Sequence, residues 1–484
     1  MEKGQIDFAK DSVWKMIFRL APPVMAAQLI QALYNIVDSF FIGRCSEEGL
    51  TALSIVYPLQ LLMIALAVGS GVGINTAMAF FFGIKKEKRA AETAGVGTPL
   101  AFMLWLLFAL ICYLIMPFYA RISTDSEMIR ADVVRYGRIV CVFSFGLFFE
   151  SIWTKILQSK GNMKLPMTAQ IIGAAVNIAL DPLLIFGWLG LPKLGITGAA
   201  ISTVIGQTAA AVIVMKQGFY KPPALKKYWV NIRNIYRLGT PNILMQSAYT
   251  FYIFGLNMIL ATFSDQAVTV LGLYYKWQTF FFIPLGALQT CIVPMISFNY
   301  AQQNTKRCRS ILWDSFIAGA VLMGMGTLCF LFIPSQMIRF FSHDSEVLRI
   351  GVHGFRIIGL SFVPMAVSLL FPVFFQAVGS PFKSSALTVI RTVFLFVPLG
   401  WLFARFGLYY FWLTYPITEI MTSAVGFAMF SRFGRNRTTP PARFKPAGRC
   451  FGKCYKSDDL RSTETIRGSE KLNRSAVSAL PISR

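Results

Sequence analysis

Charged residues and histidines are scarce in this chain. Asp, Glu, Lys and Arg together make up 14% of its 484 residues, whereas hydrophobic residues make up 55%. Soluble globular proteins contain about 25% charged residues, so this composition excludes a soluble fold and predicts a protein embedded in a lipid bilayer. The chain also has only 2 histidines, and of its 8 cysteines only Cys450 and Cys454 lie close together, which argues against a zinc site.

The few charges are unevenly divided, because the formal net charge is +24. A strongly basic chain can bind nucleic acid, but these Lys and Arg residues lie in short gaps between apolar runs, where they orient a membrane protein. No nucleic-acid partner is therefore expected. The first apolar run continues from Val13 to Gly43 without a small-residue cleavage site, so we expect a retained helix rather than a signal peptide.

Long apolar runs dominate the sequence. Twelve of them are long enough for a helix to span a bilayer. They cover residues 13–43, 49–83, 90–118, 131–159, 165–188, 195–216, 235–262, 266–300, 308–334, 348–378, 382–404 and 407–431. We therefore predict an all-α integral membrane protein with twelve transmembrane helices.

The sequence repeats itself at a spacing of 218 residues. Ile17-Phe18-Arg19-Leu20 recurs as Ile235-Tyr236-Arg237-Leu238, and Pro23 recurs as Pro241. Each copy contains six of the predicted helices, and because six is even the copies form a parallel repeat that enters the membrane from one side. The predicted organisation is an amino-terminal lobe at 1–216, a cytoplasmic linker at 217–234, a carboxy-terminal lobe at 235–432 and a basic, disordered tail at 433–484.

Lys and Arg are also unequally divided between the two sets of loops that join the predicted helices. One set holds 16 of them and the opposite set holds 7. The richer set is expected on the cytoplasmic side, together with both chain termini and the tail.

The first predicted helix carries four polar residues spaced 3, 4 and 3 apart: Gln28, Gln31, Asn35 and Asp38. This spacing places them on one face of a helix, as in a stripe that lines an interior path. An acid in hydrocarbon is costly unless it faces an aqueous cavity or a partner, so we expect Asp38 to be functional. Gln28 and Gln31 serve equally well as hydrogen-bonding contacts between helices, and for them both interpretations stay open.

A second acidic position lies in the fifth predicted helix, where Asn177 and Asp181 are four apart and share a face. Pro182 lacks an N–H, so it leaves one carbonyl of the preceding turn without its helical partner. Together with Thr203 and Gln207 of the sixth helix, these oxygens suit Na⁺ or a shared proton. The alternative is a helix kink at Asp181-Pro182 that places the acid at the outer surface.

Other deep polar residues give less specific indications. Glu150 fits a structural ion pair with a neighbouring lysine as well as it fits a functional site. Lys276 and Arg391 are cations at membrane depth that either pair with Glu419 or serve the structure. Pro23 removes a hydrogen bond from the first helix, which then either bends there during transport or keeps a static kink.

Several short motifs, in this order on twelve predicted helices, resemble those of the multidrug and toxic compound extrusion (MATE) family of transporters. The resemblance spans residues 12–432. The motifs run from Leu33 to Gly43 (LYNIVDSFFIG), from Gly161 to Pro166 (GNMKLP), from Asn177 to Pro182, from Gly195 to Ala200 (GITGAA) and from Ser297 to Tyr300 (SFNY). The chain is most similar to the bacterial branch of DNA-damage-inducible and staphylococcal multidrug exporters.

The resemblance implies a V-shaped arrangement of two six-helix lobes around a central cavity, in a transporter and not an enzyme. Such a transporter exports drugs, often cationic and aromatic, in exchange for H⁺ or Na⁺ and uses no cofactor. The coupling site of the family maps onto Asp38, Asn177, Asp181 and Thr203, where Na⁺ is the only candidate metal. Family members bend the first helix at the position that matches Pro23.

The path of the drug is expected to follow polar residues at membrane depth. Its candidate lining residues are Gln28, Gln31, Tyr34, Asn35, Gln207, Lys276 and Glu419. We expect a multi-pass monomer in the cytoplasmic (inner) membrane of a bacterium, with the lipid bilayer and small-molecule drugs as its partners.

Two rival functions stay open. A lipid-linked saccharide flippase of the same superfamily needs a large cationic cavity for a pyrophosphate headgroup, for which Lys276 and Arg391 are candidates, whereas Asn177 and Asp181 argue against it. An inactive membrane scaffold would act through its basic tail. The sequence does not choose between H⁺ and Na⁺ as the coupling ion.

Overall fold

The computed structural model describes residues 6–431 and 433. The chain divides into two units, residues 1–430 and residues 431–484. The tail predicted from residue 433 onward lies outside the described residues except for Phe433, and so do Cys450 and Cys454.

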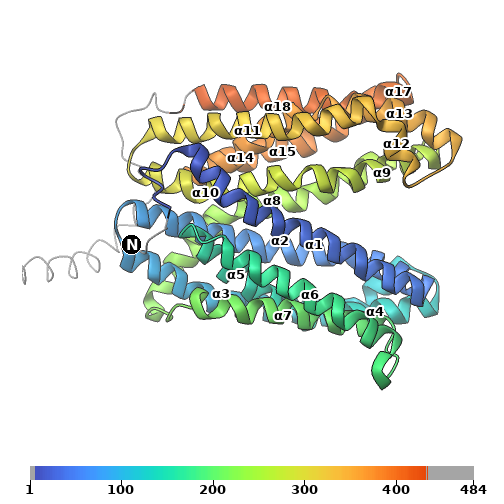
Figure 1. Cartoon of the computed structure of the whole chain (residues 1–484), viewed down its shortest axis with the longest axis horizontal. Coiled ribbons are helices and arrows are strands. Elements are labelled where there is room, and N and C mark those ends of the chain that lie inside the picture. Colours follow the sequence, from blue (N-terminus) through green and yellow to red (C-terminus); the bar gives the residue numbers. More distant parts are fainter. Residues whose placement is uncertain (1–5, 432, 434–484) are drawn as a thin grey trace, which may run out of the picture. The chain divides into compact units, whose positions relative to one another are not determined.

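The described part of the first copy of the repeat, here called the amino-terminal lobe, consists of helices (Figure 1). They are α1 (Val13–Cys45), α2 (Glu47–Gly83), α3 (Glu87–Ser123), α4 (Glu127–Val142), α5 (Phe145–Ser159), α6 (Lys164–Phe186), the 3₁₀ turn η1 (Trp188–Gly190) and α7 (Ile196–Gly218). Side-chain caps fix several helix starts, because Ser12 accepts from the backbone N–H of Lys15 and Ser46 accepts from that of Gly49.

The second copy, here called the carboxy-terminal lobe, is also helical in its described part. It contains the 3₁₀ turn η2 (Leu225–Lys227), α8 (Tyr228–Ala261), α9 (Asp265–Phe281), α10 (Ile283–Ala301), α11 (Thr305–Phe332), α12 (Pro334–Arg339), α13 (Ser345–Gly359), α14 (Phe362–Ala377), α15 (Pro381–Val389), the π-helical segment η3 (Ile390–Phe396), α16 (Val397–Ala404), α17 (Leu408–Phe411) and α18 (Thr414–Ser431). The two lobes meet where α2 packs against α8, and where α1 and α2 pack against α10.

The all-helical membrane architecture agrees with the sequence, although the number of spans is less simple than predicted. Eight of the described helices are long and apolar enough to cross a membrane, and the number rises to eleven when each of three bent helix pairs is taken as one span. The predicted twelfth span, 407–431, corresponds to α17 and α18 and is not among the eleven. α18 instead carries several buried polar residues, including Thr418, Glu419 and Thr422.

Three spans that the sequence predicts as single helices are bent pairs. α4 and α5 meet at 40°, α9 and α10 at 49°, and α13 and α14 at 52°. The break before α10 has a simple cause, because Pro284 occupies the second position of that helix. The residue 218 positions earlier is Leu66, and α2 continues through it without a break.

A serine lies at each of the other two breaks, and the second of these breaks is also followed by Pro364, the third residue of α14. Ser144 lies between α4 and α5, and its hydroxyl donates to the carbonyl of Cys141 at 2.7 Å. Ser361 lies between α13 and α14, and its hydroxyl donates to the carbonyl of Ile358 at 2.6 Å. Because each hydroxyl satisfies a carbonyl in the last turn before the bend, it compensates the local loss of helical hydrogen bonding.

Glycines allow α2 and α8 to approach each other closely. A Cβ added to Gly73 would lie 2.1 Å from the carbonyl oxygen of Ile235, and a Cβ added to Gly239 would lie 2.4 Å from that of Gly69. Both distances are shorter than any real contact, so only glycine fits at these positions of the lobe interface. Small residues at helix contacts are the usual way in which membrane helices pack.

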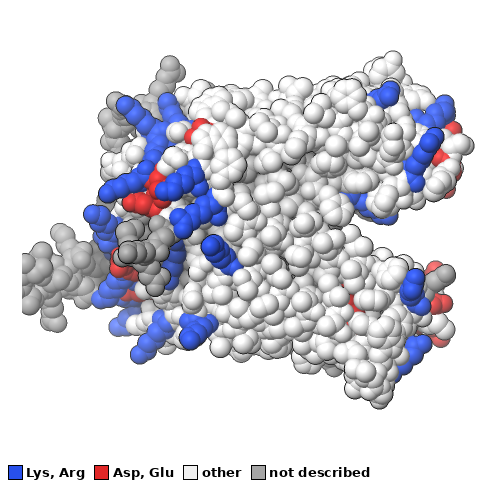
Figure 2. All heavy atoms as spheres, viewed as in Figure 1, with Lys and Arg blue, Asp and Glu red and all other residues white. Residues whose placement is uncertain are grey.

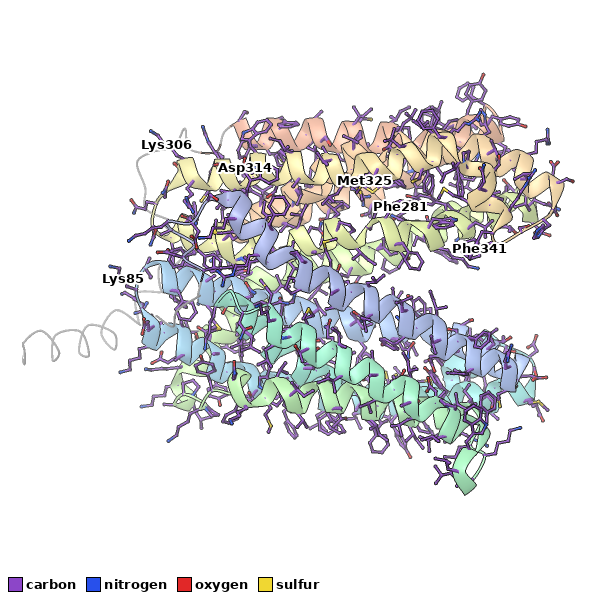
Figure 3. All side chains as sticks on the ribbon, viewed as in Figure 1. Lys85, Phe281, Lys306, Asp314, Met325 and Phe341 are labelled. Carbon is purple, nitrogen blue, oxygen red and sulfur yellow. The ribbon has the colours of Figure 1, made fainter. Side chains whose placement is uncertain are left out.

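Charged side chains gather at the two ends of the first unit and leave a broad uncharged band between them (Figure 2). Lys85 and Lys306 lie at one end, here called the basic end, and Phe341 lies near the other (Figure 3). At the end opposite the basic end, the surface is hollowed between the two lobes (Figure 2).

Residues 6–12, which precede α1, connect the two lobes at the basic end. The carbonyl oxygen of Phe8 accepts hydrogen bonds from Asn299 Nδ2 at 2.9 Å and from Arg307 Nε at 3.0 Å. The ring of Phe8 packs on that of Phe298, with centroids 5.8 Å apart. On the side of the amino-terminal lobe, a Cβ added to Gly161 would lie 3.2 Å from Cζ of Phe8. Phe8 therefore contacts both copies of the repeat.

Candidate functional site

Helices α1, α6 and α7 pack together and carry the four residues predicted to form the coupling site. Asp38 comes from α1, Asn177 and Asp181 come from α6, and Thr203 comes from α7; all four side chains are buried. Asp181 has 0% of its surface exposed, and α6 continues through Pro182. This geometry excludes the alternative in which the acid reaches the outer surface at a kink.

Glycine again determines how close the helices come. A Cβ added to Gly206 on α7 would lie 2.6 Å from the carbonyl oxygen of Gly173 on α6 and 3.0 Å from Cβ of Asn177. A Cβ added to Gly173 would lie 2.7 Å from the carbonyl oxygen of Gly206. These two glycines let α7 lie against the polar face of α6, so that the Asn177 side chain reaches Thr203.

Ser202 on α7 joins the polar residues of α6 into one network. Its hydroxyl donates to Oδ1 of Asp181. Asn177 Nδ2 lies 3.4 Å from Oγ of Ser202 and 3.5 Å from Oγ1 of Thr203, so it donates weakly to both. The sequence did not indicate Ser202, because the spacing of four between Thr203 and Gln207 directs attention to a neighbouring face of α7.

The network is rich in acceptors and poor in donors. Four buried oxygens have no hydrogen-bond partner in the described part of the chain: Asp38 Oδ1, Asn177 Oδ1, Asp181 Oδ2 and Gln207 Oε1. Buried polar atoms are nearly always satisfied in native proteins, so such a group of unsatisfied acceptors needs an explanation. A bound cation or a proton satisfies carboxylate and amide oxygens equally well.

The two carboxylates of the site are both buried, and they lie on α1 and α6, which pack against each other. Carboxylates that lie close together in a buried site repel each other, and a shared cation or proton offsets that repulsion. The donors at the site are carboxylate, amide and hydroxyl oxygens, which are the ligand atoms that hard cations prefer.

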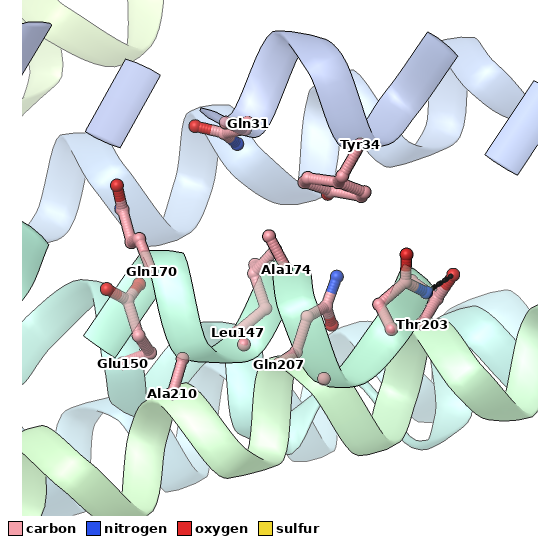
Figure 4. A pocket seen from close by; sticks show the side chains of 12 residues that line it. Gln31, Tyr34, Leu147, Glu150, Gln170, Ala174, Thr203, Gln207 and Ala210 are labelled. Atoms are coloured by element: carbon pink, nitrogen blue, oxygen red, sulfur yellow. Dashed lines mark hydrogen bonds between the residues drawn. The ribbon is translucent and has the colours of Figure 1, made fainter. Parts of the chain in front are cut away.

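A small cavity of about 80 Å³ adjoins the coupling residues (Figure 4). Asn177 and Thr203 contribute to its wall, which is otherwise formed by residues of α1, α5, α6 and α7. They include Gln31, Tyr34, Leu147, Glu150, Gln170 and Gln207. A space of this size holds a few water molecules or a hydrated ion and is much smaller than the pockets that hold drug-sized ligands.

The predicted polar stripe of α1 divides between two environments. Gln31 and Tyr34 face the 80 Å³ cavity. Gln28 lines a different cavity of about 200 Å³, which lies between the lobes and also contacts α2, α5, α8, α10 and α14. Asn35 is exposed, and its backbone carbonyl accepts from the hydroxyl of Ser39. The polar residues of α1 therefore do not line one continuous path through the protein.

The predicted path residues of the carboxy-terminal lobe lie on helices that do not belong to the α1, α6 and α7 cluster. Glu419 is fully buried and pairs with Arg391, with 2.6 Å between Oε1 and Nη2. Lys276 does not share this pair, because it is exposed and its ammonium group lies 4.9 Å from the ring centroid of Phe341. Of the two cations considered as partners of Glu419, only Arg391 is one.

Pro23 and Glu150 are two further positions that the sequence singled out. α1 continues as one helix from Val13 to Cys45 through both Pro22 and Pro23, so the first helix is unbroken in this conformation. Glu150 accepts a hydrogen bond from Thr154 at 2.7 Å, whereas the neighbouring Lys155 donates to Gln158 at 2.9 Å.

Both copies of the repeat match a known family. The family model MatE matches residues 23–183 and residues 241–402, which together cover more than half of the chain. Among solved structures, the chain is similar to one described as the outward-facing conformation of a multidrug resistance MATE family transporter of the MOP superfamily. The TM-score is 0.82 with 21% identity, over 89% of this chain and 97% of that chain.

Two curated relatives extend over most of the chain. The multidrug export protein MepA of Staphylococcus aureus (strain MRSA252) is 23% identical over 415 residues, which is 83% of this chain and 90% of the relative. The FAD transporter of Shewanella oneidensis (strain ATCC 700550 and its equivalents) is 23% identical over 420 residues, which is 84% of this chain and 92% of the relative.

Proposed function

Because the chain belongs to the MATE (MatE) family of membrane transporters, and is thus a transporter and not an enzyme, we propose that it exports organic drugs in exchange for H⁺ or Na⁺. The observation that carries this proposal is a group of buried oxygens on Asp38, Asn177, Asp181 and Gln207 that have no hydrogen-bond donor among the described residues. A cation or a proton bound at the site supplies the partner that these acceptors lack.

Coupling follows from the position of these oxygens on three helices. A cation bound between the buried carboxylates of Asp38 and Asp181 attracts both of them and so draws α1 and α6 together. Loss of the cation restores the repulsion and favours an arrangement in which the helices lie further apart. A cation drives export only because its affinity for these two arrangements differs. α1 can bend at Pro22 and Pro23, since each proline removes a helical hydrogen bond.

The direction of transport follows from the charge distribution. The basic end faces the cytoplasm of a bacterial cell in this proposal, together with the amino terminus. The hollow between the lobes, at the other end (Figure 2), then opens to the outside. The conformation is thus one from which substrate leaves the cell.

The substrates proposed are organic molecules of drug size, often cationic and aromatic. The relative named as a multidrug export protein supports this class, whereas the relative named as an FAD transporter extends it to a larger, anionic compound. The rival function as a flippase of lipid-linked saccharides is less well supported. It requires a cationic cavity, but Arg391 is paired with Glu419 and Lys276 is exposed.

The test is efflux of ethidium from cells that express Asp38→Asn or Asp181→Asn. Each change removes a carboxylate charge and keeps the shape, so we expect a loss of export of about tenfold or more. The matched control is Asp265→Asn, since Asp265 is an exposed acid in the first turn of α9. Wild-type efflux from both site variants would contradict the proposal.

A second measurement identifies the coupling ion. Purified protein in proteoliposomes is given a pH gradient and a Na⁺ gradient in separate experiments, and ethidium movement is followed. We expect one gradient to drive transport and both site variants to abolish it. Equal transport with neither gradient would exclude antiport.

A further inference from the structure

A groove lies between α3 and α4, near the end of the amino-terminal lobe that is opposite the basic end (Figure 1). Its volume is about 750 Å³. Four arginines line this groove together with one glutamate: Arg121 of α3, and Arg130, Arg135, Arg138 and Glu127 of α4. Arg130 and Arg138 are eight residues apart, which is about two helical turns, so they lie on one face of α4.

The charge of this groove runs against the charge asymmetry of the chain. The loops between the predicted helices hold 16 Lys and Arg residues on the basic side and 7 on the other side. Arg135 and Arg138 add to these 7, because they lie within the predicted helix 131–159. Orientation in the membrane depends on an excess of Lys and Arg on the basic side, so arginines concentrated on the other side need a different explanation.

Carboxylates do not neutralise the arginines of the groove. The salt bridges of the described part of the chain include none of the four. Glu127 is the acid in the wall, and Asp132 interacts with Arg135 from beyond salt-bridge distance. The groove therefore has a net positive charge, and it suits an anionic ligand.

Two of these arginines are oriented by the protein and still have unsatisfied donors. Arg130 Nη2 donates to the carbonyl of Thr124 at 3.2 Å, and Cζ of Arg138 lies 4.5 Å from the ring centroid of Tyr113 on α3. Nε of Arg130 and Nε of Arg138 are buried without an acceptor among the described residues. A guanidinium presents Nε and one Nη along the same edge, and this edge matches two oxygens of a phosphate.

α3 offers an apolar surface beside the arginines. Leu114, Phe118 and Ile122 are exposed, and because they are four residues apart they share a face of this helix. α3 is long and apolar enough to cross a membrane, so such residues contact lipid chains. A ligand that fits both features carries a phosphate next to hydrocarbon chains, as a phospholipid does.

We propose that this groove binds the headgroup of an anionic glycerophospholipid from the adjoining leaflet. Arg130 and Arg138 donate to the phosphate, Arg121 and Arg135 add positive charge, and one acyl chain lies along the exposed apolar face of α3. The net positive charge favours phosphatidylglycerol over the zwitterionic phosphatidylcholine. The groove shares no lining residue with the 80 Å³ cavity, so the inference does not depend on the proposed export function.

The test uses photoreactive phosphatidylglycerol and photoreactive phosphatidylcholine, which carry the same diazirine at the same position of one acyl chain. Each lipid is a minor component of phosphatidylcholine nanodiscs that hold the full-length protein. After irradiation, crosslinks to residues 113–139 are quantified by mass spectrometry. We expect phosphatidylglycerol to label this segment about tenfold more than phosphatidylcholine does. Equal labelling by the two lipids would overturn the inference.

Competitors separate a lipid from a free anion. An excess of phosphatidylglycerol without the diazirine should remove the label from residues 113–139. Inorganic phosphate should leave the label in place, because it lacks the acyl chain that lies on α3. Loss of the label with inorganic phosphate, or a label that persists with excess phosphatidylglycerol, would contradict the proposal.

Variants locate the headgroup. We expect Arg130→Gln combined with Arg138→Gln to lower labelling by phosphatidylglycerol about tenfold, because both donors to the phosphate are lost. Arg339→Gln combined with Arg405→Gln is the matched control, since it removes two exposed arginines of the carboxy-terminal lobe and should keep the labelling. Labelling at the basic end should be equal in both double variants. A label between α3 and α4 that survives in the first double variant would place the headgroup elsewhere and exclude this site.

A single exposed substitution provides a second test in case the double variant does not fold. Glu127→Gln removes the acid from the wall of the groove and so raises its net positive charge. We expect labelling of residues 113–139 by phosphatidylglycerol to increase severalfold, and labelling by phosphatidylcholine to change little. Unchanged or weaker labelling by phosphatidylglycerol would show that the charge of the groove does not select the lipid.

Discussion

The hydroxyl of Ser202 orients one oxygen of the buried Asp181 carboxylate. It donates to Oδ1 of Asp181 and lies within reach of Asn177, whereas Oδ2 of Asp181 has no partner among the described residues. One oxygen of the carboxylate is thus fixed by the protein, and the other is the oxygen that we propose to bind the cation. Such a partner orients the ligand atom without binding the cation itself.

Replacement of Ser202 tests this arrangement. Ser202→Ala removes the donor to Asp181, so we expect ethidium efflux to fall by about tenfold or more. Ser202→Thr keeps a hydroxyl and should restore most of the efflux. Thr208→Ala serves as the control on the same helix, because its hydroxyl donates to the carbonyl of Val204 within α7 and not to a residue of the candidate site. Equal efflux from Ser202→Ala and the control would show that the hydroxyl has no part in coupling.

At the same scale, the sequence points to some of the buried polar residues of the candidate site and not to others. Asp38, Asn177 and Asp181 stand out because an acid or amide in an apolar helix is costly, and their role in coupling stays a prediction. Ser202 could not, since a serine is common in membrane helices and its direction depends on how α7 is rotated against α6. The partner of Glu419 was open for the same reason, because Lys276 and Arg391 are equally plausible until their helices are placed.

Among the elements, the contact between α2 and α8 depends most clearly on single residues. Gly73 and Gly239 each lie where a Cβ would overlap a backbone carbonyl of the opposite helix. A backbone carbonyl cannot move aside as a flexible side chain can. Even the smallest substitution must therefore separate the two helices.

We expect Gly73→Ala to lower the thermal unfolding temperature in detergent and to reduce the amount of folded protein, because the added methyl group separates α2 from α8. Gly324→Ala is the matched control, since a Cβ added to Gly324 on α11 meets nothing within 4 Å. Alanine is the better helix former by about 1 kcal/mol, so the control should be neutral or slightly stabilising. Similar unfolding temperatures for the two variants would show that the α2–α8 contact tolerates expansion.

Helix breaks show where prediction from sequence reaches its limit. The break before α10 could be predicted, because Pro284 stands where the first copy has Leu66. The break at Ser361 has a similar signal, because Pro364 is the third residue of α14. The break at Ser144 could not be predicted, since no proline lies near it and a single serine in an apolar helix does not by itself specify a bend. That bend depends on packing against neighbouring helices, which the local sequence does not specify.

At the scale of the whole first unit, residues 6–12 act as a strap across the basic end. Phe8 accepts hydrogen bonds from the carboxy-terminal lobe and packs near Gly161 of the amino-terminal lobe. Any conformation that opens this end must break some of these contacts. The strap therefore favours the arrangement that is closed here and hollowed between the lobes at the other end (Figure 2).

Weakening of the strap should shift the balance between conformations. We expect Phe8→Ala to increase opening at the basic end severalfold, because the ring contact with Phe298 is lost. The measurement is the distance distribution between spin labels at Lys85 and Lys306, which lie at this end on different lobes (Figure 3). The control is Phe18→Ala, since Phe18 is a 70% exposed residue of α1. A distribution identical to that of the wild type would assign the strap no role in closure.

The lengths of the longest helices have a consequence for the surrounding bilayer. α2 and α3 each contain 37 residues, which corresponds to about 55 Å at 1.5 Å per residue, whereas the hydrocarbon core is about 30 Å thick. Each of these helices must therefore tilt in the bilayer or extend into the headgroup region. A thicker membrane is then accommodated by a smaller tilt, without exposing polar helix ends to lipid tails, so the fold tolerates a wide range of membrane thickness.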